Sequence, residues 1–232
     1  MIVLALDSTA TVATAALVRN GEVLASDTVN CGRTHSETLL PLIEVLYEKA
    51  KLSPKDTDLY ACSAGPGSFT GVRIGTALIK GMAFGNKPCL GVSTLEALAE
   101  NLSSVTGIVC PVMDARRGQV YNALFRVKDK KLTRLTPDRV IMLDELQTEL
   151  SGYREPIYFC GDGYHLTIDG ISHPQKQVTP DEFMMQNAVS VAKVALRDYE
   201  NGKAVSDSEL RPIYLRAPQA ERERNEKLNN KS

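Results

Sequence analysis

The chain has 232 residues, of which 43% are hydrophobic, a share typical of a globular protein with a substantial core. Its formal net charge of −1 excludes a global positive field that would draw it to nucleic acid or to a membrane surface. No apolar run reaches the about 18 residues of a membrane-spanning helix, and the start is not basic, so we expect neither a membrane span nor a signal peptide. Five scattered cysteines without a C-x-x-C motif indicate reduced thiols in a cytoplasmic protein.

The first fifty residues predict three strands and one helix. Residues 2–6, 12–19 and 22–29 are strand-like, and Asn20-Gly21 between the last two is typical of a type I′ hairpin turn. A helix is predicted after Thr34, which forms a capping box with the glutamate three residues later. Its apolar face consists of Leu39, Leu42, Ile43, Leu46 and Ala50. Pro41 predicts a kink or a later start of this helix.

A glycine-rich loop follows the apolar strand at residues 59–63. The segment Ala64–Gly75, AGPGSFTGVRIG, opens a predicted helix that ends near Phe84, and Ser68 or Thr70 can cap that helix. Backbone N–H groups at a helix start favour an anion, so the loop can cradle a phosphate. The alternative is that its glycines only permit close packing. The spacing fits neither the dinucleotide fingerprint nor the P-loop, and both interpretations stay open.

Small residues continue along this helix, including Gly71, Gly75 and Gly81. Glycine in a helix costs about 1 kcal/mol relative to alanine, so a compensating role is expected. Small residues on one face let another backbone come close. They predict a helix–helix contact, either within the chain or with a partner.

The second half of the chain resembles a restart of the first. Residues 109–114 echo residues 2–7, and the offset from Asp7 to Asp114 (114 − 7 = 107) equals the offset from Arg19 to Arg126. Such self-similarity predicts a duplicated α/β fold of two facing lobes. The expected first lobe comprises residues 1–105 and the second 106–218, and residues 219–232 are predicted to be a disordered charged tail. Further elements are predicted at residues 89–92, 94–102, 143–150, 156–160, 187–199 and 211–216.

The turn after the first strand is the first candidate site. In two-lobed folds of this kind this turn commonly meets phosphate. Asp7 can position a metal-bound water or simply cap its own turn, and the structural role is favoured because the turn lacks the glycine of sugar kinases. His35, His165 and His173 lack metal-ligand spacing, so we expect no metal and no catalytic residues. The weak nucleotide or phosphate candidates are Asp7, Ser8, Thr9, Gly65 and Gly67.

The glycine-rich segment, with Lys80-Gly81-Met82-Ala83 after it, resembles the signature of the bacterial TsaB (YeaZ) family, a non-catalytic branch related to TsaD. The resemblance covers residues 1 to about 125 well and the rest loosely. Further matching segments are His35-Ser36-Glu37, Val92 to Leu98, Asp114 to Tyr121 and Tyr214-Leu215-Arg216.

This resemblance implies an actin-like ATPase fold (ribonuclease H-like, duplicated) and a role in placing threonylcarbamoyl on the adenosine next to the anticodon of tRNA. It implies a non-catalytic subunit that pairs with TsaD, which holds the metal, and with the ATPase TsaE. It also implies a homodimer when the chain is alone and tRNA contact only through the complex. The metal-binding H-x-x-x-H pair of the catalytic paralogue corresponds here to Thr94 and Leu98, and leucine cannot bind a metal.

No cofactor is expected to be required, although ATP or ADP can be accommodated in the cleft or at the partner interface. The rival hypothesis is an active small-molecule kinase or ATPase that uses the Asp7 turn. For the partner interface we expect the two helices around the glycine loop, and Gly75→Leu is expected to block pairing without unfolding the protein. The interface candidates are His35, Leu39, Leu40, Ile43, Tyr47, Gly71, Ile74, Gly75 and Leu78.

Overall fold

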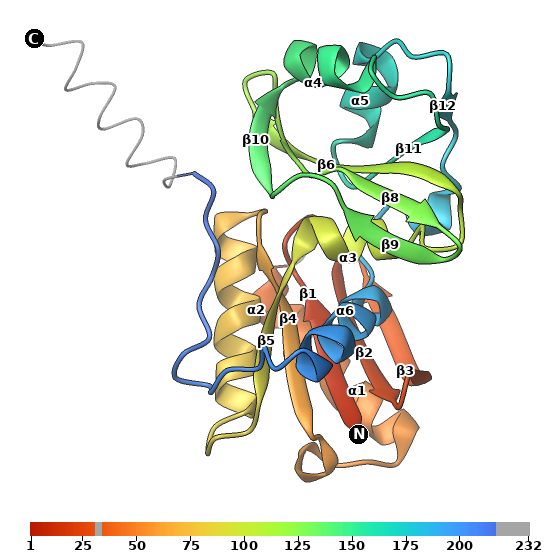
Figure 1. Cartoon of the computed structure of the whole chain (residues 1–232). Helices are drawn as coiled ribbons and strands as arrows, with labels where there is room; N and C mark the ends of the chain where they lie inside the picture. Colours follow the sequence, from red (N-terminus) through yellow and green to blue (C-terminus); the bar gives the residue numbers. More distant parts are fainter. Residues whose placement is uncertain (31–33, 217–232) are drawn as a thin grey trace, which may run out of the picture.

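Two mixed β-sheets, one in each lobe, organise the computed structural model, which describes residues 1–30 and 34–216 (Figure 1). The first sheet has the order β3-β2-β1-β4-β5, with β1, β2 and β3 antiparallel and β4 and β5 parallel to β1. Asn20 and Gly21 both have positive φ, so the predicted hairpin turn is confirmed. The strands are β1 (Ile2–Asp7), β2 (Ala13–Arg19), β3 (Glu22–Val29), β4 (Leu59–Gly65) and β5 (Cys89–Ser93).

Helices cover both faces of this sheet because its strands alternate two apolar sets. Leu4 and Leu6 of β1 face α1 (His35–Ala50) and α2 (Phe69–Met82), whereas Val3 and Ala5 face α6 (Ala188–Glu200). A short 3-10 turn, η1 (Pro54–Asp56), precedes β4. A further helix, α3 (Thr94–Glu100), lies between the two lobes (Figure 1).

The second sheet repeats the strand order of the first. Its main path is β10-β7-β6-β11-β12, in which β6 takes the place of β1, and β8 pairs with β6 and β9. This repeat confirms the duplicated two-lobe α/β fold of the actin-like ATPase class. The elements are β6 (Gly107–Arg116), β7 (Gln119–Asn122), β8 (Phe125–Lys128), β9 (Lys131–Arg134), β10 (Arg139–Met142), α4 (Leu143–Leu150), β11 (Ile157–Cys160), α5 (Tyr164–Gly170), β12 (Lys176–Gln177) and η2 (Asp181–Phe183).

Helix α6 returns to the first lobe, although the sequence prediction assigned residues 106–218 to the second. Val191 and Val194 pack against β1 in one core cluster with Val3 and Ala5. The chain therefore crosses between the lobes twice, before β6 and before α6. The reason is physical: the apolar face of α6 covers the side of the first sheet that α1 and α2 leave open.

Helix α1 starts at His35 and runs unbroken to Ala50, so the expected later start is not found. Thr34 N donates to the Glu37 carboxylate over 3.1 Å, as the capping box predicts. Pro41 lies on the exposed side of the helix, away from the core that the helix covers. The predicted tail at residues 219–232 lies outside the described residues. In the described ranges no helix is both long and apolar enough to cross a bilayer.

Two glycines of α2 provide a matched test of close packing. A Cβ at Gly71 would overlap the Ser8 carbonyl oxygen, whereas a Cβ at Gly81 would meet no atom within 4 Å. We expect Gly71→Ala to lower the free energy of unfolding by about 1–3 kcal/mol or more. Gly81→Ala should raise it by about 0.5–1 kcal/mol, because alanine restricts the unfolded chain. Urea denaturation of both variants measures the difference, and equal effects would contradict the packing role.

Candidate functional site

A cleft of about 390 Å³ lies between the lobes. The first lobe contributes the turn after β1 and the loop before α2, and the second lobe contributes the end of β6 and the loop after β11. The segment that follows α6 forms a third wall. Lining residues include Thr9, Gly67 and Ser68 from the first lobe, Asp114, Arg116 and Asp162 from the second, and Tyr214 to Arg216.

Asp7 lies beneath this cleft and does not line it. The residue is 1% exposed, and its Oδ1 accepts hydrogen bonds from the Thr9 backbone N–H (2.8 Å) and the Thr9 hydroxyl (2.7 Å). Its Oδ2 has no hydrogen-bond partner among the described residues. Burial raises the pKa of Asp7, and the nearby Ser63 hydroxyl and the hydrogen bonds from Thr9 only partly oppose that shift. The carboxyl group thus organises its own turn.

The glycine loop packs directly on this turn. Ser68 N donates to the Thr9 carbonyl over 2.7 Å, and the Ser8 hydroxyl donates to the Gly71 carbonyl over 2.9 Å. A Cβ at Gly67 would lie 2.5 Å from the Thr9 carbonyl oxygen. The predicted cap is also present, since Ser68 Oγ accepts from Gly71 N over 3.3 Å. This geometry gives Gly67 and Gly71 a packing role, and the phosphate cradle stays a prediction.

Gly65 faces away from the turn and towards the end of the chain. A side chain there would overlap the carbonyl of Ile213, whose N–H donates to the Ala64 carbonyl over 2.7 Å. Tyr214 then stacks on Phe69 at a centroid distance of 4.5 Å. Arg73 lies 3.9 Å above the Phe69 ring and donates to the Tyr214 hydroxyl over 2.9 Å.

The described chain ends at the cleft, where the Arg216 guanidinium donates to the Ala115 carbonyl over 2.5 Å. We call residues 206–216 the strap, because they run along α2 and reach the second lobe (Figure 1). Sequence reasoning predicted an extended segment at residues 211–216 but gave it no role. An aromatic and a cationic side chain, Tyr214 and Arg216, were visible in the sequence. Their role could not be predicted, because the residues that they contact are distant in the sequence.

The second lobe brings two carboxylates to the cleft. Asp114 N donates to Asp162 Oδ1 over 3.3 Å, and the Asp114 carboxylate pairs with Arg116 at 3.3 Å. Burial, helped by the nearby Asp114 charge, raises the pKa of Asp162 to about 6. Arg116 is 81% exposed, so its ion pair is a solvated surface contact.

No three histidine, cysteine, aspartate or glutamate side chains within residues 1–30 and 34–216 lie close enough to hold a metal ion. Thr94 and Leu98, which the sequence resemblance aligns with a metal-binding pair, lie one helical turn apart on α3 and are 0% and 1% exposed. Leu98 packs with Phe125 and Val109 in a core cluster. Leu98 is therefore a core residue of this chain.

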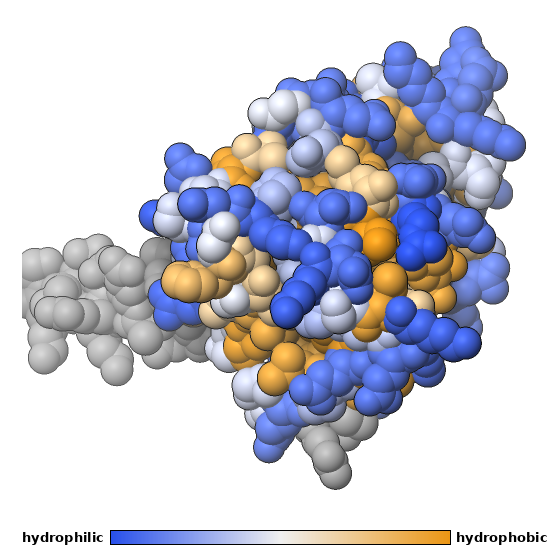
Figure 2. Space-filling view, turned by 90° about the horizontal axis from the view of Figure 1, so that it is seen from below, coloured by the Kyte–Doolittle hydropathy of each residue, from blue (hydrophilic) through white to orange (hydrophobic). Residues whose placement is uncertain are grey.

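The proposed partner face on α1 and α2 is smaller than the sequence predicted. Leu39, Ile43 and Tyr47 are buried in the core of this chain, and Gly71 and Gly75 are covered by Ser8. Leu40 is 47% exposed, and His35, Ile74 and Leu78 are partly exposed. On the side of the molecule seen in Figure 2, apolar surface occurs in patches among hydrophilic side chains.

The expected behaviour of Gly75→Leu needs correction. A Cβ at Gly75 would lie 2.6 Å from Ser8 Oγ and 3.0 Å from Leu6 Cδ1, so a leucine would disturb the core of this chain. His35 has a similar internal role, since its Nε2 lies 2.8 Å from the Ala10 carbonyl oxygen. Exposed positions are required to test the surface separately from the fold.

The raised pKa of Asp162 predicts a pH dependence of stability. Between the ordinary value of 3.8 and about 6, the folded state holds a proton that the unfolded state has lost, so the free energy of unfolding should fall as pH rises through this window. Asp162→Asn keeps an acceptor for Asp114 N but cannot titrate, so it should remove this pH dependence of the free energy of unfolding. Denaturation of both proteins at several pH values measures it, and an NMR titration of the Asp162 carboxyl should give a midpoint near 6. A midpoint near 3.8 would contradict the burial argument.

A family model and two relatives of known name match this chain over most of its length. The family model described as TsaD, tRNA N6-adenosine threonylcarbamoyltransferase, matches residues 27–206. The tRNA threonylcarbamoyladenosine biosynthesis protein TsaB of Bacillus subtilis is 35% identical over 162 residues, which cover 69% of this chain and 71% of the relative. The protein of the same name from Escherichia coli is 29% identical over 223 residues, covering 93% and 95%.

A crystal structure from Pseudomonas aeruginosa, described as an uncharacterized protein with similarity to peptidase YEAZ, superimposes with a TM-score of 0.81. It is 26% identical and covers 93% of this chain and 99% of that one. The family-model match and the identity to these relatives show that the chain belongs to the TsaB family of tRNA threonylcarbamoyladenosine biosynthesis proteins, within the wider TsaD family.

Proposed function

We propose that this chain is a non-catalytic subunit required for threonylcarbamoyladenosine modification of the adenosine next to the anticodon, acting as the partner of TsaD together with TsaE. The observation that carries this proposal is which side chains occupy two positions on α3. By the sequence resemblance, Thr94 and Leu98 align with the two histidines of the catalytic paralogue. Both are buried, and Leu98 packs in the cluster between α3 and the second lobe. The scaffold is kept, and the ligands for a metal are replaced by core side chains.

The Asp7 turn supports the same proposal against the kinase or ATPase alternative. In this chain the Asp7 carboxyl is buried beneath the Thr9 backbone, and the glycine loop packs on that backbone. A carboxylate that positions metal-bound phosphate needs access to the cleft. Isothermal titration of the isolated chain with Mg-ATP should therefore give neither tight binding nor turnover. Tight binding with turnover that Asp7→Ala abolishes would favour the enzyme.

Leu40 is the residue best suited to test pairing with TsaD. It is 47% exposed on α1 and is not part of the core cluster beneath that helix. The other side of α1 faces β3, because Lys49 pairs with Asp27 at 3.3 Å. Val45 lies on that side, five positions after Leu40 and thus about 140° around the helix. The α2 side of α1 is the part of the surface that we assign to the partner.

Leu40→Glu should abolish pairing with TsaD, because a carboxylate would be buried without a partner at an apolar contact. Val45→Glu, in the same helix and at a similar exposure of 41%, is the matched control and should pair normally. Co-purification with TsaD and threonylcarbamoyl transfer to tRNA in a reconstituted mixture are the measurements. Full transfer activity without this chain would refute the proposed role. Loss of pairing in both variants, or in neither, would refute only the assigned face.

A further inference from the structure

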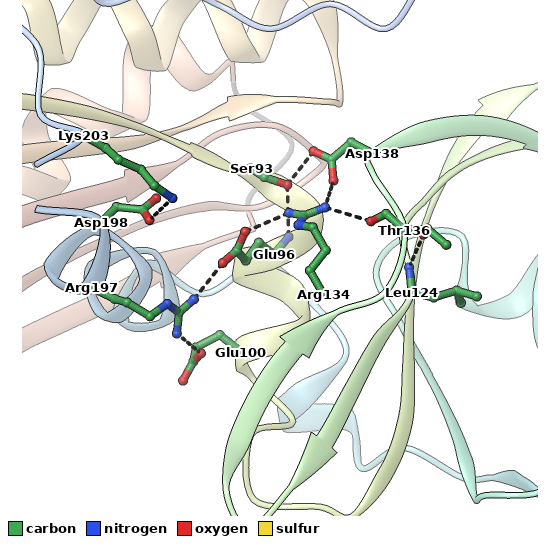
Figure 3. Close-up of polar contacts among 10 residues, drawn as sticks. All are labelled: Ser93, Glu96, Glu100, Leu124, Arg134, Thr136, Asp138, Arg197, Asp198 and Lys203. Carbon is green, nitrogen blue, oxygen red and sulfur yellow. Dashed lines mark hydrogen bonds and ion pairs between the residues drawn. The ribbon is translucent and has the colours of Figure 1, made fainter. Parts of the chain in front are cut away.

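A chain of alternating charges crosses from one lobe to the other at α3 (Figure 3). Glu96 is its centre, because each of its carboxylate oxygens binds a different arginine. Oε2 accepts from Arg134 of β9 over 2.8 Å, and Oε1 accepts from Arg197 of α6 over 2.8 Å. One carboxylate on α3 therefore joins the second lobe to a helix that covers the first sheet.

Both arginines extend the chain with a second carboxylate. Arg134 also donates to Asp138 Oδ1 over 2.6 Å, and Asp138 Oδ2 accepts from the Ser93 hydroxyl over 2.6 Å, so the second lobe is held to the end of β5 as well. Arg197 also donates to Glu100 over 3.2 Å. Every link in this path is visible in Figure 3.

The network is better protected from solvent than an ordinary surface ion pair. The side chains of Asp138, Glu96, Arg134 and Arg197 are 14%, 23%, 31% and 41% exposed, and the Arg134 guanidinium lies 4.6 Å above the Phe125 ring. Burial would raise the pKa of Glu96, but the hydrogen bonds and charges of the two arginines outweigh it and lower that pKa. Charges that are partly buried and multiply paired are screened less and are held in defined geometry.

Because α3 lies between the lobes, this network can fix the angle between them. On one side α3 contributes Leu95 and Leu98 to a cluster with Val109 and Phe125 of the second lobe, and on the other it contacts α6. The strap supplies a separate tie at the cleft, where Arg216 binds the Ala115 carbonyl. The α3 network and the strap thus tie the lobes together through segments that are far apart in the sequence.

We infer that Glu96 is the hub of a clasp, formed with Arg134, Asp138 and Arg197, that fixes the angle between the two lobes and thereby the width of the cleft. The clasp makes the chain behave as one rigid body whether or not the cleft is filled. Domain closure around a ligand, which is a common motion of two-lobed proteins, is suppressed here by ion pairs that must break before the lobes can rotate. This inference does not depend on the proposed function.

The test measures the distance between the lobes in the full chain by pulsed electron paramagnetic resonance. Spin labels are placed at the exposed positions Lys55→Cys in the first lobe and Lys128→Cys in the second, in a Cys31→Ser background. The cysteines of the described residues are 0% exposed and should not be labelled: Cys62, Cys89, Cys110 and Cys160. The unmodified clasp should give a narrow distance distribution.

Glu96→Ala should broaden this distribution by about twofold or more, because it removes both arginine contacts at once. Arg134→Met should do the same, since it keeps an apolar stem over Phe125 and removes only the charge that crosses between the lobes. If Glu96→Ala does not fold, Arg134→Met alone decides the question.

The matched control is Asp198→Asn, which breaks the ion pair to Lys203 at 2.7 Å, also drawn in Figure 3. That pair lies within α6 and the turn after it and does not cross between the lobes, so its loss should leave the distribution narrow. A folded Arg134→Met protein with an unchanged distribution would overturn the inference. Equal broadening in Asp198→Asn would overturn it too, because the effect would then not be specific to the clasp.

Discussion

The close approach of the α2 backbone to the turn after β1 is the constraint on which the first lobe depends. Gly71 lies against the Ser8 carbonyl, and Ser68 donates its N–H to Thr9. Only glycine permits this approach, because any Cβ would occupy the space of a backbone oxygen. The contact buries Asp7, sets the floor of the cleft and positions Phe69 for Tyr214. The glycine-rich segment thus determines the shape of the site through packing.

The two lobes share one architecture but are joined asymmetrically. Helix α6 leaves the second lobe to complete the first, and the strap follows it back along α2 to the cleft. Helix α3 packs in both directions, with Leu98 in the core of the second lobe and Glu96 between Arg134 and Arg197. Helix α3 is thus a structural link between the lobes.

These features fit the role proposed above, that of a subunit that acts through its surface. The apolar side chains of α1 are divided between the core and a small exposed remainder, in which Leu40 is prominent. Such a surface requires a rigid fold beneath it, because a partner recognises the positions of a few exposed side chains at once. Close glycine packing in the first lobe and ion pairs between the lobes both make the fold rigid.

The sequence by itself determined the elements whose signals are local. The hairpin turn at Asn20-Gly21, the capping box at Thr34 and the helix at residues 143–150 follow from neighbouring residues alone, and the repeat predicted the duplicated fold. The family followed from the motif around Gly71 and was confirmed by the relatives.

Tertiary structure decided everything that depends on contacts between distant segments. Periodicity placed Leu39 and Ile43 on one apolar face but could not tell whether the core or a partner covers that face. The assignment of α6 to the first lobe, the raised pKa of Asp162 and the double pairing of Glu96 likewise arise from residues far apart in the chain. Local sequence sets conformational preference and amphipathic pattern, whereas burial and pairing are set by which surfaces meet once the chain has folded.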